Sequence, residues 1–190
     1  MKESRNCIYC GKTADTVDHV PPKCFLDKPY PNNLLTLPAC KKCNNNCSSD
    51  EQYLMYLSDY IRSIENVDGE FTREKAKLTF EHSEKLEDRM ISSLKIEDGV
   101  VYFDFETDRV IKIIDKVSYG LLYAHYGTSF KVTKSNFAII TSLNEKQCSE
   151  FDSIKWIIVQ EKRFKYSIAS QLIYFVVNDI ILCVSSYSIP

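Results

Sequence analysis

The sequence has no long run of apolar residues. Its longest uninterrupted apolar segment is Leu172 to Val177, whereas a helix that crosses a bilayer needs about 18 apolar residues or more. The opening residues, Met-Lys-Glu-Ser-Arg, are also unlike a secretory signal, which has an apolar stretch after its first charges. We therefore expect a soluble, cytoplasmic protein without a membrane partner.

The sequence also has no excess of basic residues. Its formal net charge is −2, which argues against a protein that coats nucleic acid by electrostatic attraction alone. The charge is unevenly distributed, because residues 1–50 contain seven Lys and Arg against five Asp and Glu, which leaves −4 for the remainder. A polyanionic partner is therefore expected to contact the N-terminal part.

The chain does contain enough apolar residues for a core, since 44% of its 190 residues are hydrophobic. The first 47 residues are rich in Cys, Pro and Asn, as is typical of a small module held together by metal. We divide the chain into a module with its following helix, residues 1–66, and an α+β accessory domain of unknown role, residues 67–190. Periodicity predicts helices over 48–65, 72–94 and 108–126 (capped by Asp108 and ended by Gly127), an extended stretch over 100–106, and antiparallel strands within 137–143, 156–160, 164–170, 172–177 and 180–187.

The eight cysteines are expected to stay reduced, so those at ligand spacing are candidates for metal binding. Two Cys-x-x-Cys pairs, Cys7 with Cys10 and Cys40 with Cys43, are separated by 29 residues. Two intervening residues let both thiolates of a pair reach one tetrahedral ion, and Gly11 favours the tight turn that such a pair needs. We predict a structural Zn²⁺ bound by these four thiolates. The other cysteines are interpreted as buried thiols: Cys24, Cys47, Cys148 and Cys183.

Only three histidines occur, and His19 follows Asp18 in the stretch TVDHVPPK, between the two cysteine pairs. A carboxylate can hold a hard cation and an imidazole can deprotonate water, and phosphodiester hydrolysis needs both. Alternation along a strand points the two side chains to opposite sides, but a modest twist lets both act at one site. Because a lone histidine is more often a hydrogen-bonded structural residue, the surrounding residues must decide.

Those surroundings are the stretch NNLLTLPACKKCNNNCSSDE. With the preceding Asp-His, it provides an Asn-Leu and then a Cys-x-x-Cys followed directly by Asn. In this combination the chain resembles the HNH endonuclease family over about its first 50 residues. The resemblance implies a zinc-stapled ββα-metal (HNH) module, followed here by helices and a C-terminal antiparallel β-sheet in an α+β fold.

The resemblance also implies roles for individual residues. His19 is expected to be the general base, Asp18 and Asn44 to hold a catalytic Mg²⁺ or Mn²⁺, and Asn33 to orient the histidine. The implied activity is metal-dependent hydrolysis of nucleic-acid phosphodiester bonds, in DNA rather than RNA, which leaves 3′-hydroxyl and 5′-phosphate ends. Contacts to neighbouring phosphates are expected from Lys23, Lys41 and Lys42.

Some alternatives stay open. Many family members have His at the position of Asn44, and the asparagine runs 32–33 and 44–46 do not fix which residue orients and which ligates. A zinc-stapled nucleic-acid or protein binding module without catalysis is the alternative function. Residues 67–190 are assigned to substrate selection, homo-oligomerisation or docking of a protein partner, and the family association suggests phage defence. We expect a fragment ending near Asp68 to keep its zinc and some cleavage.

Overall fold

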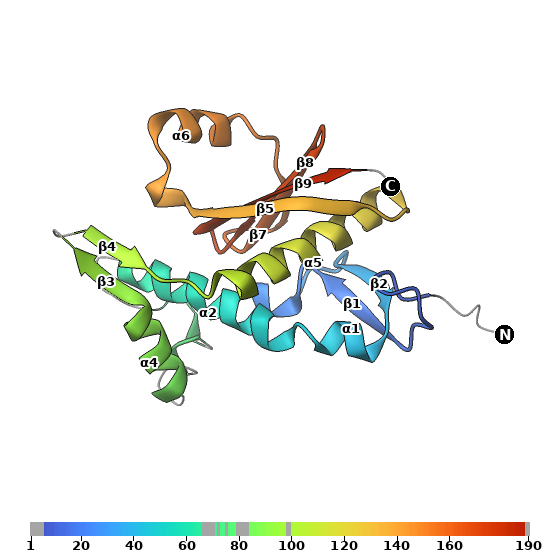
Figure 1. The fold of residues 1–190 in the computed structure, drawn as a ribbon, viewed down its shortest axis with the longest axis horizontal. Coiled ribbons are helices and arrows are strands. Elements are labelled where there is room, and N and C mark those ends of the chain that lie inside the picture. Colours follow the sequence, from blue (N-terminus) through green and yellow to red (C-terminus); the bar gives the residue numbers. More distant parts are fainter. Residues whose placement is uncertain are drawn as a thin grey trace.

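The computed structural model describes residues 6–65, 71, 73–74, 76–78, 84–97 and 100–188. It is an α+β protein in which one long helix, α5, lies between an N-terminal β-hairpin with its helices and a C-terminal sheet (Figure 1). In chain order the elements are β1 (Thr16–Val20), η1 (Lys23–Phe25), β2 (Leu35–Ala39), α1 (Lys41–Asn45), α2 (Ser48–Glu65), α4 (Glu84–Ser93), β3 (Leu94–Glu97), β4 (Val100–Phe103), α5 (Thr107–Tyr126), β5 (Lys131–Ile139), η2 (Ile140–Ser142), α6 (Glu145–Asp152), β6 (Ile157–Gln160), β7 (Phe164–Ala169), β8 (Leu172–Val177) and β9 (Ile181–Ser188).

The N-terminal hairpin pairs β1 with β2 in an antiparallel register that sets Asp18 opposite Leu37 and His19 opposite Thr36. Alternation along β1 buries Asp18 and Val20 and leaves Val17 exposed. One residue separates β2 from the short helix α1, and two residues separate α1 from α2. The predicted helix over 48–65 is confirmed at both ends.

The helix α5 carries the apolar stripe that the sequence predicts, and it ends at Gly127, whose φ of 71° is left-handed. Its start differs from the prediction. Glu106 is the N-cap residue and makes no side-chain capping bond, whereas Asp108 lies inside the first turn. There its carboxylate still complements the positive end of the helix dipole.

Among the described residues, no helix combines the length and apolar character that crossing a bilayer requires.

The predicted helix over 72–94 is wrong at Leu94. Of the described residues in this stretch, 74, 76–78 and 84–93 (the last being α4) are helical, whereas Leu94 is the first residue of β3, which pairs with β4. Leu94 lies opposite Phe103, so cross-strand pairing with the extended stretch overrides the helical periodicity at this point. Residues 79–83, within the predicted helix, and the predicted domain boundary at residue 66 lie outside the described residues.

The C-terminal sheet is antiparallel, as predicted, with the strand order β5-β9-β8-β7-β6. The predicted strand over 137–143 is wrong at its end, because β5 stops at Ile139 and gives way to η2 and then α6. The sequence analysis missed α6. It is started by a capping box in which Asn144 and Gln147 bond each other's backbone N–H. Cys148 lies on this helix and is exposed, so its interpretation as a buried thiol was wrong, while Cys183 is fully buried.

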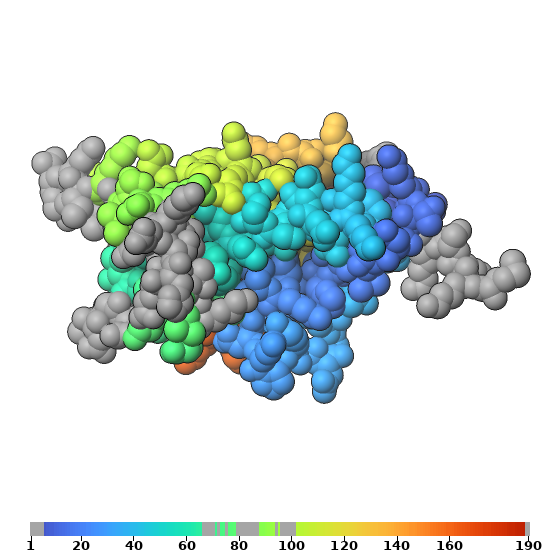
Figure 2. All heavy atoms as spheres, turned by 90° about the horizontal axis from the view of Figure 1, so that it is seen from below, coloured from blue at the N-terminus to red at the C-terminus, as the bar shows by residue number. Residues whose placement is uncertain are grey.

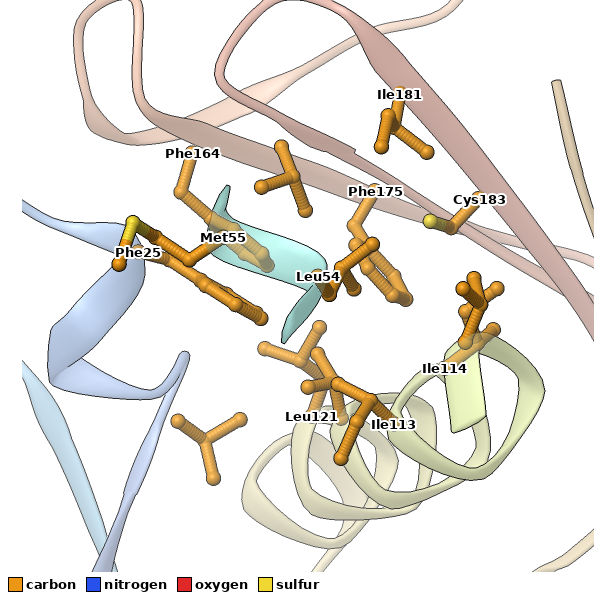
Figure 3. Close-up of a cluster of buried hydrophobic side chains, with 14 of the residues drawn as sticks. Phe25, Leu54, Met55, Ile113, Ile114, Leu121, Phe164, Phe175, Ile181 and Cys183 are labelled. Carbon is orange, nitrogen blue, oxygen red and sulfur yellow. The ribbon is translucent and has the colours of Figure 1, made fainter. Parts of the chain in front are cut away.

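A single hydrophobic core joins the N-terminal part to the C-terminal sheet. Phe25, Leu54 of α2, Leu121 of α5 and Phe175 of β8 belong to one cluster of buried side chains and lie close together in Figure 3. Phe25 stacks on Phe164, with ring centroids 6.4 Å apart. The N-terminal part therefore shares its apolar interior with α5 and the sheet.

Charged contacts also fasten α5 to α2. Asp50, at the start of α2, binds Arg109 Nε at 2.7 Å and Lys112 Nζ at 2.6 Å. Arg109 in addition lies over the Tyr53 ring, 4.5 Å from its centroid. Figure 2 shows the N-terminal segment, α2 and the first part of α5 side by side on one face.

Candidate metal centre and adjoining pocket

Four cysteines form a cluster at the N-terminal end of the molecule. The sulfur atoms of Cys7, Cys10, Cys40 and Cys43 all lie within 4.8 Å of one another, and those of Cys10 and Cys40 are 3.8 Å apart. Thiolates about 2.3 Å from a tetrahedral ion lie roughly 3.8 Å from one another. The four predicted ligands are thus together, at a spacing that fits a metal ion such as zinc.

Local backbone structure explains why each pair forms a knuckle. After Cys7 the chain turns sharply, with Gly11 at a φ of 73° donating its N–H to the Cys7 carbonyl at 2.8 Å. Cys40 is the N-cap of α1, and its sulfur accepts the Cys43 N–H at 3.5 Å. Burial acts to raise the pKa of Cys7, but N–H donors, with that of Cys40 first, outweigh it and lower this pKa to about 7. Cys7 is therefore inclined toward the thiolate form that metal binding requires, whereas burial first, and then the neighbouring cysteine side chains, raise the pKa of Cys43.

A pocket of about 250 Å³ has Asn44, which follows Cys43 directly in α1, among its lining residues. It brings together three residues that the sequence assigned to catalysis, Asp18, His19 and Asn44, although they come from β1 and α1. Lys23 also lines it, whereas Lys41 and Lys42 are exposed outside it. The residues lining the pocket are Asp18, His19, Pro22, Lys23, Cys24, Asn44, Ser48, Glu51 and Gln52.

Asn33 takes a different position. It is exposed in the segment before β2 and is not one of the residues that line this pocket. The adjacent Leu34 N–H closes a turn on the Pro31 carbonyl at 3.2 Å. The orienting role given to Asn33 has no side-chain contact to His19 among the described residues and stays a prediction.

Asp18 is buried and its carboxylate has several partners. Oδ1 accepts the His19 backbone N–H at 3.0 Å. Oδ2 accepts the Tyr9 hydroxyl at 2.7 Å and lies 2.9 Å from Lys116 Nζ. The same Nζ lies 2.5 Å from Glu51 Oε1, so one ammonium bridges two carboxylates whose residues line the pocket.

His19 is half-buried on β1, next to Asp18 in the chain. Burial lowers the pKa of His19, the nearby Lys23 ammonium lowers it further, and the Asp18 carboxylate acts in the opposite direction. The net result favours a neutral imidazole near pH 7, the form that can accept a proton.

Asn44 is fixed against β1 by a hydrogen bond from its Nδ2 to the Val17 carbonyl, 3.0 Å long. This bond uses the amide nitrogen and leaves the carbonyl oxygen, which is a hard ligand, for a cation. Of the three asparagines at 44–46, Asn44 is the one that lines the pocket.

The sequence analysis missed three residues of this site: Tyr9, Glu51 and Lys116. Glu51 lies seven residues after Asn44, a spacing that would place both on one face of a continuous helix. Because α1 and α2 are separate helices, this spacing does not show from the sequence that the two residues lie close together. Lys116 is a charged residue beside the apolar stripe of α5, next to Ile114 and Val117, which are buried. A lysine in that setting signals a buried partner, although nothing in the sequence identifies the partner.

A larger hollow, about 1060 Å³, lies elsewhere, between α6 and the strands of the C-terminal sheet. Its lining includes Phe137, Phe151, Tyr174 and Leu182, and no residue that the sequence assigned to metal or catalysis. Three of the residues that the sequence assigned to catalysis, Asp18, His19 and Asn44, therefore line the smaller pocket and not this hollow. Searches of protein-family models, of curated proteins and of solved structures found no significant match to this chain.

Proposed function

We propose that this chain is a metal-dependent endonuclease of the HNH type that hydrolyses phosphodiester bonds, with DNA favoured over RNA. The observation that carries the proposal is the convergence of Asp18, His19 and Asn44 on one pocket, with Asn44 directly after Cys43 of the four-cysteine cluster. These are an imidazole and two hard oxygen ligands, as metal-assisted hydrolysis of a phosphodiester requires.

In this mechanism His19 is the general base. Its neutral imidazole accepts a proton from a water molecule, whose oxygen then attacks phosphorus as the bond to the 3′ oxygen breaks. Asp18 and Asn44 would hold Mg²⁺ or Mn²⁺, which when bound stabilises the charge on the phosphate and on the leaving oxygen. Lys23, at the rim of the pocket, contacts a neighbouring phosphate.

Zinc has a structural role in this proposal. Cys43 immediately precedes Asn44, and Cys40 directly follows β2, the strand that pairs with β1. An ion bound to the four thiolates fixes α1 relative to β1, and with it the distance between the carboxamide and the Asp-His pair.

The test is cleavage of plasmid DNA by purified protein with Mg²⁺ or Mn²⁺, with EDTA as the metal-free control. His19→Ala is expected to lower the rate by about two orders of magnitude or more, as for loss of a general base, with zinc content unchanged. His125→Ala is the matched control, because His125 is exposed and lies at the other hollow. Wild-type rates for His19→Ala would refute the proposal.

One observation favours the alternative, a binding module without catalysis. The Asp18 carboxylate is already engaged by Lys116 and Tyr9, as a purely structural carboxylate would be. In that case the protein would bind nucleic acid in a salt-dependent way, without metal-dependent cleavage, and His19→Ala would bind as well as the wild type.

A further inference from the structure

The amino group of Lys116, from α5, contacts two of the carboxylates that line the pocket, although Lys116 is not itself one of the lining residues. It lies 2.9 Å from Asp18 Oδ2 and 2.5 Å from Glu51 Oε1, and the three side chains are 7%, 6% and 13% exposed in the order Lys116, Asp18 and Glu51. The Tyr9 ring lies beneath it, 5.8 Å from centroid to Nζ. A buried ammonium of this kind is held by the carboxylates and in turn holds them in place.

The contacts with the Lys116 ammonium leave carboxylate oxygens that can also bind a divalent cation. Asp18 Oδ1 accepts one N–H and keeps a lone pair, and the bond from Lys116 to Glu51 uses Oε1 and not Oε2. Asn44 lines the same pocket, and its hydrogen bond to Val17 uses the amide nitrogen and not the carbonyl oxygen. Two carboxylates and one carboxamide are a typical hard-ligand set for Mg²⁺ or Mn²⁺.

The charges at this point then determine how strongly a cation is held. Asp18 and Glu51 contribute two negative charges and Lys116 one positive charge, so these three side chains carry a net charge of −1. The ammonium repels the cation at short range, where screening by solvent and salt is weak. The cation and Lys116 therefore compete for the same two carboxylates.

We propose that Glu51 is a third protein ligand of the divalent cation, and that Lys116 is an internal counter-ion that weakens cation binding at this site. The inference rests on the proposed function, since it concerns the same cation. It gives α5 a direct part in the site, because the affinity for metal is set by a residue 98 positions after Asp18 in the chain.

A series of charge variants tests this by calorimetric titration with Mn²⁺ and by thermal unfolding with and without Mn²⁺. Lys116→Gln, which removes the charge but keeps a hydrogen-bond donor, is expected to bind Mn²⁺ at least about tenfold tighter than the wild type. Glu51→Gln is expected to bind at least about tenfold more weakly. The double variant Lys116→Gln/Glu51→Gln restores the net charge of −1 and is expected to lie within about threefold of the wild type.

Lys112→Gln is the matched control. Lys112 lies one turn before Lys116 on α5 and pairs with Asp50, outside the lining of the pocket. It is expected to change Mn²⁺ affinity by less than about threefold. Circular dichroism and zinc content establish that each variant is folded, and Lys116→Met replaces Lys116→Gln if the latter is not.

The outcomes separate this inference from the proposed function. Equal or weaker Mn²⁺ binding by folded Lys116→Gln overturns the inference, and cleavage that still depends on His19 then leaves the nuclease assignment standing. If neither the wild type nor Lys116→Gln binds Mn²⁺, both the inference and the assignment of the cation site are wrong. Tighter binding that is lost with Glu51 supports the inference even for a protein that does not cleave DNA.

Discussion

Replacement of Gly120 by alanine tests how tightly α5 is packed against the strand that carries His19. Gly120 is buried on α5. A Cβ atom added there would lie 2.8 Å from Val20 Cγ2, 3.3 Å from Val20 Cγ1 and 3.5 Å from the Tyr9 hydroxyl oxygen. Because Val20 follows His19 directly in β1, we expect Gly120→Ala to disturb both stability and the site.

Two opposing effects determine the magnitude. Overpacking a tight interior costs about 1–3 kcal/mol, and Val20 has little room to move because it is 2% exposed and its strand is paired with β2. Alanine in a helix interior is favoured over glycine by about 0.8–1.0 kcal/mol. The net loss is therefore about 1 kcal/mol, with an upper bound of about 2, which lowers Tm by roughly 2–8 °C for a domain of this size.

The assay is a double-mutant cycle of urea unfolding with Val20→Ala. Val20→Ala alone destabilises by leaving a cavity, but in the double variant the new methyl group occupies part of that space. The double variant is expected to be more stable than the sum of the single effects by about 1 kcal/mol or more. Strict additivity, or a Gly120→Ala protein as stable as the wild type with unchanged cleavage, would refute the close contact between α5 and β1.

Three further predictions concern the cysteines, the histidine and the shared core. Elemental analysis should find about one zinc per chain. Cys40→Ser should lose this zinc, whereas Cys148→Ser, at an exposed thiol, should keep it, and zinc retained by Cys40→Ser would contradict the four-cysteine site. Because burial and Lys23 lower the pKa of His19, the cleavage rate should decline on the acid side with a midpoint below the usual 6.5. Lys23→Gln should move that midpoint to higher pH, and a shift to lower pH would oppose the assignment of His19 as the general base. For a fragment ending at Asp68 the sequence predicted retained zinc and some cleavage. Because the N-terminal part shares its core with α5 and the sheet, which this fragment lacks, the fragment is now expected to lose cooperative thermal unfolding. A transition at the temperature of the full chain would contradict this.

Local signals explain what the sequence could predict. The four cysteines are recognisable because each pair lies within four residues, and the chemistry of a thiolate ligand set depends on spacing alone. The helix α5 is recognisable because its apolar stripe is regular and Gly127 ends it. The capping residues of α6, Asn144 and Gln147, are also local, so that helix was within reach of the sequence and was overlooked.

Long-range contacts explain what the sequence could not predict. The ion pair of Lys116 with Asp18 and Glu51 joins segments that periodicity describes one at a time, and no local pattern relates them. Leu94 likewise becomes a strand residue through its partner Phe103, although its own neighbours favour a helix. Buried polar partners and strand partners are properties of the tertiary structure.

The position of Lys116 in the chain has a consequence during protein synthesis. Translation proceeds at about 5–20 residues per second, so α2 is synthesised roughly 3–10 seconds before Lys116. In that interval Asp18 and Glu51 exist without the ammonium that later bridges them, and two carboxylates brought close together without it repel each other. A nascent chain therefore assembles this pocket only after translation has passed residue 116, and products of premature termination before that point lack the bridging cation altogether.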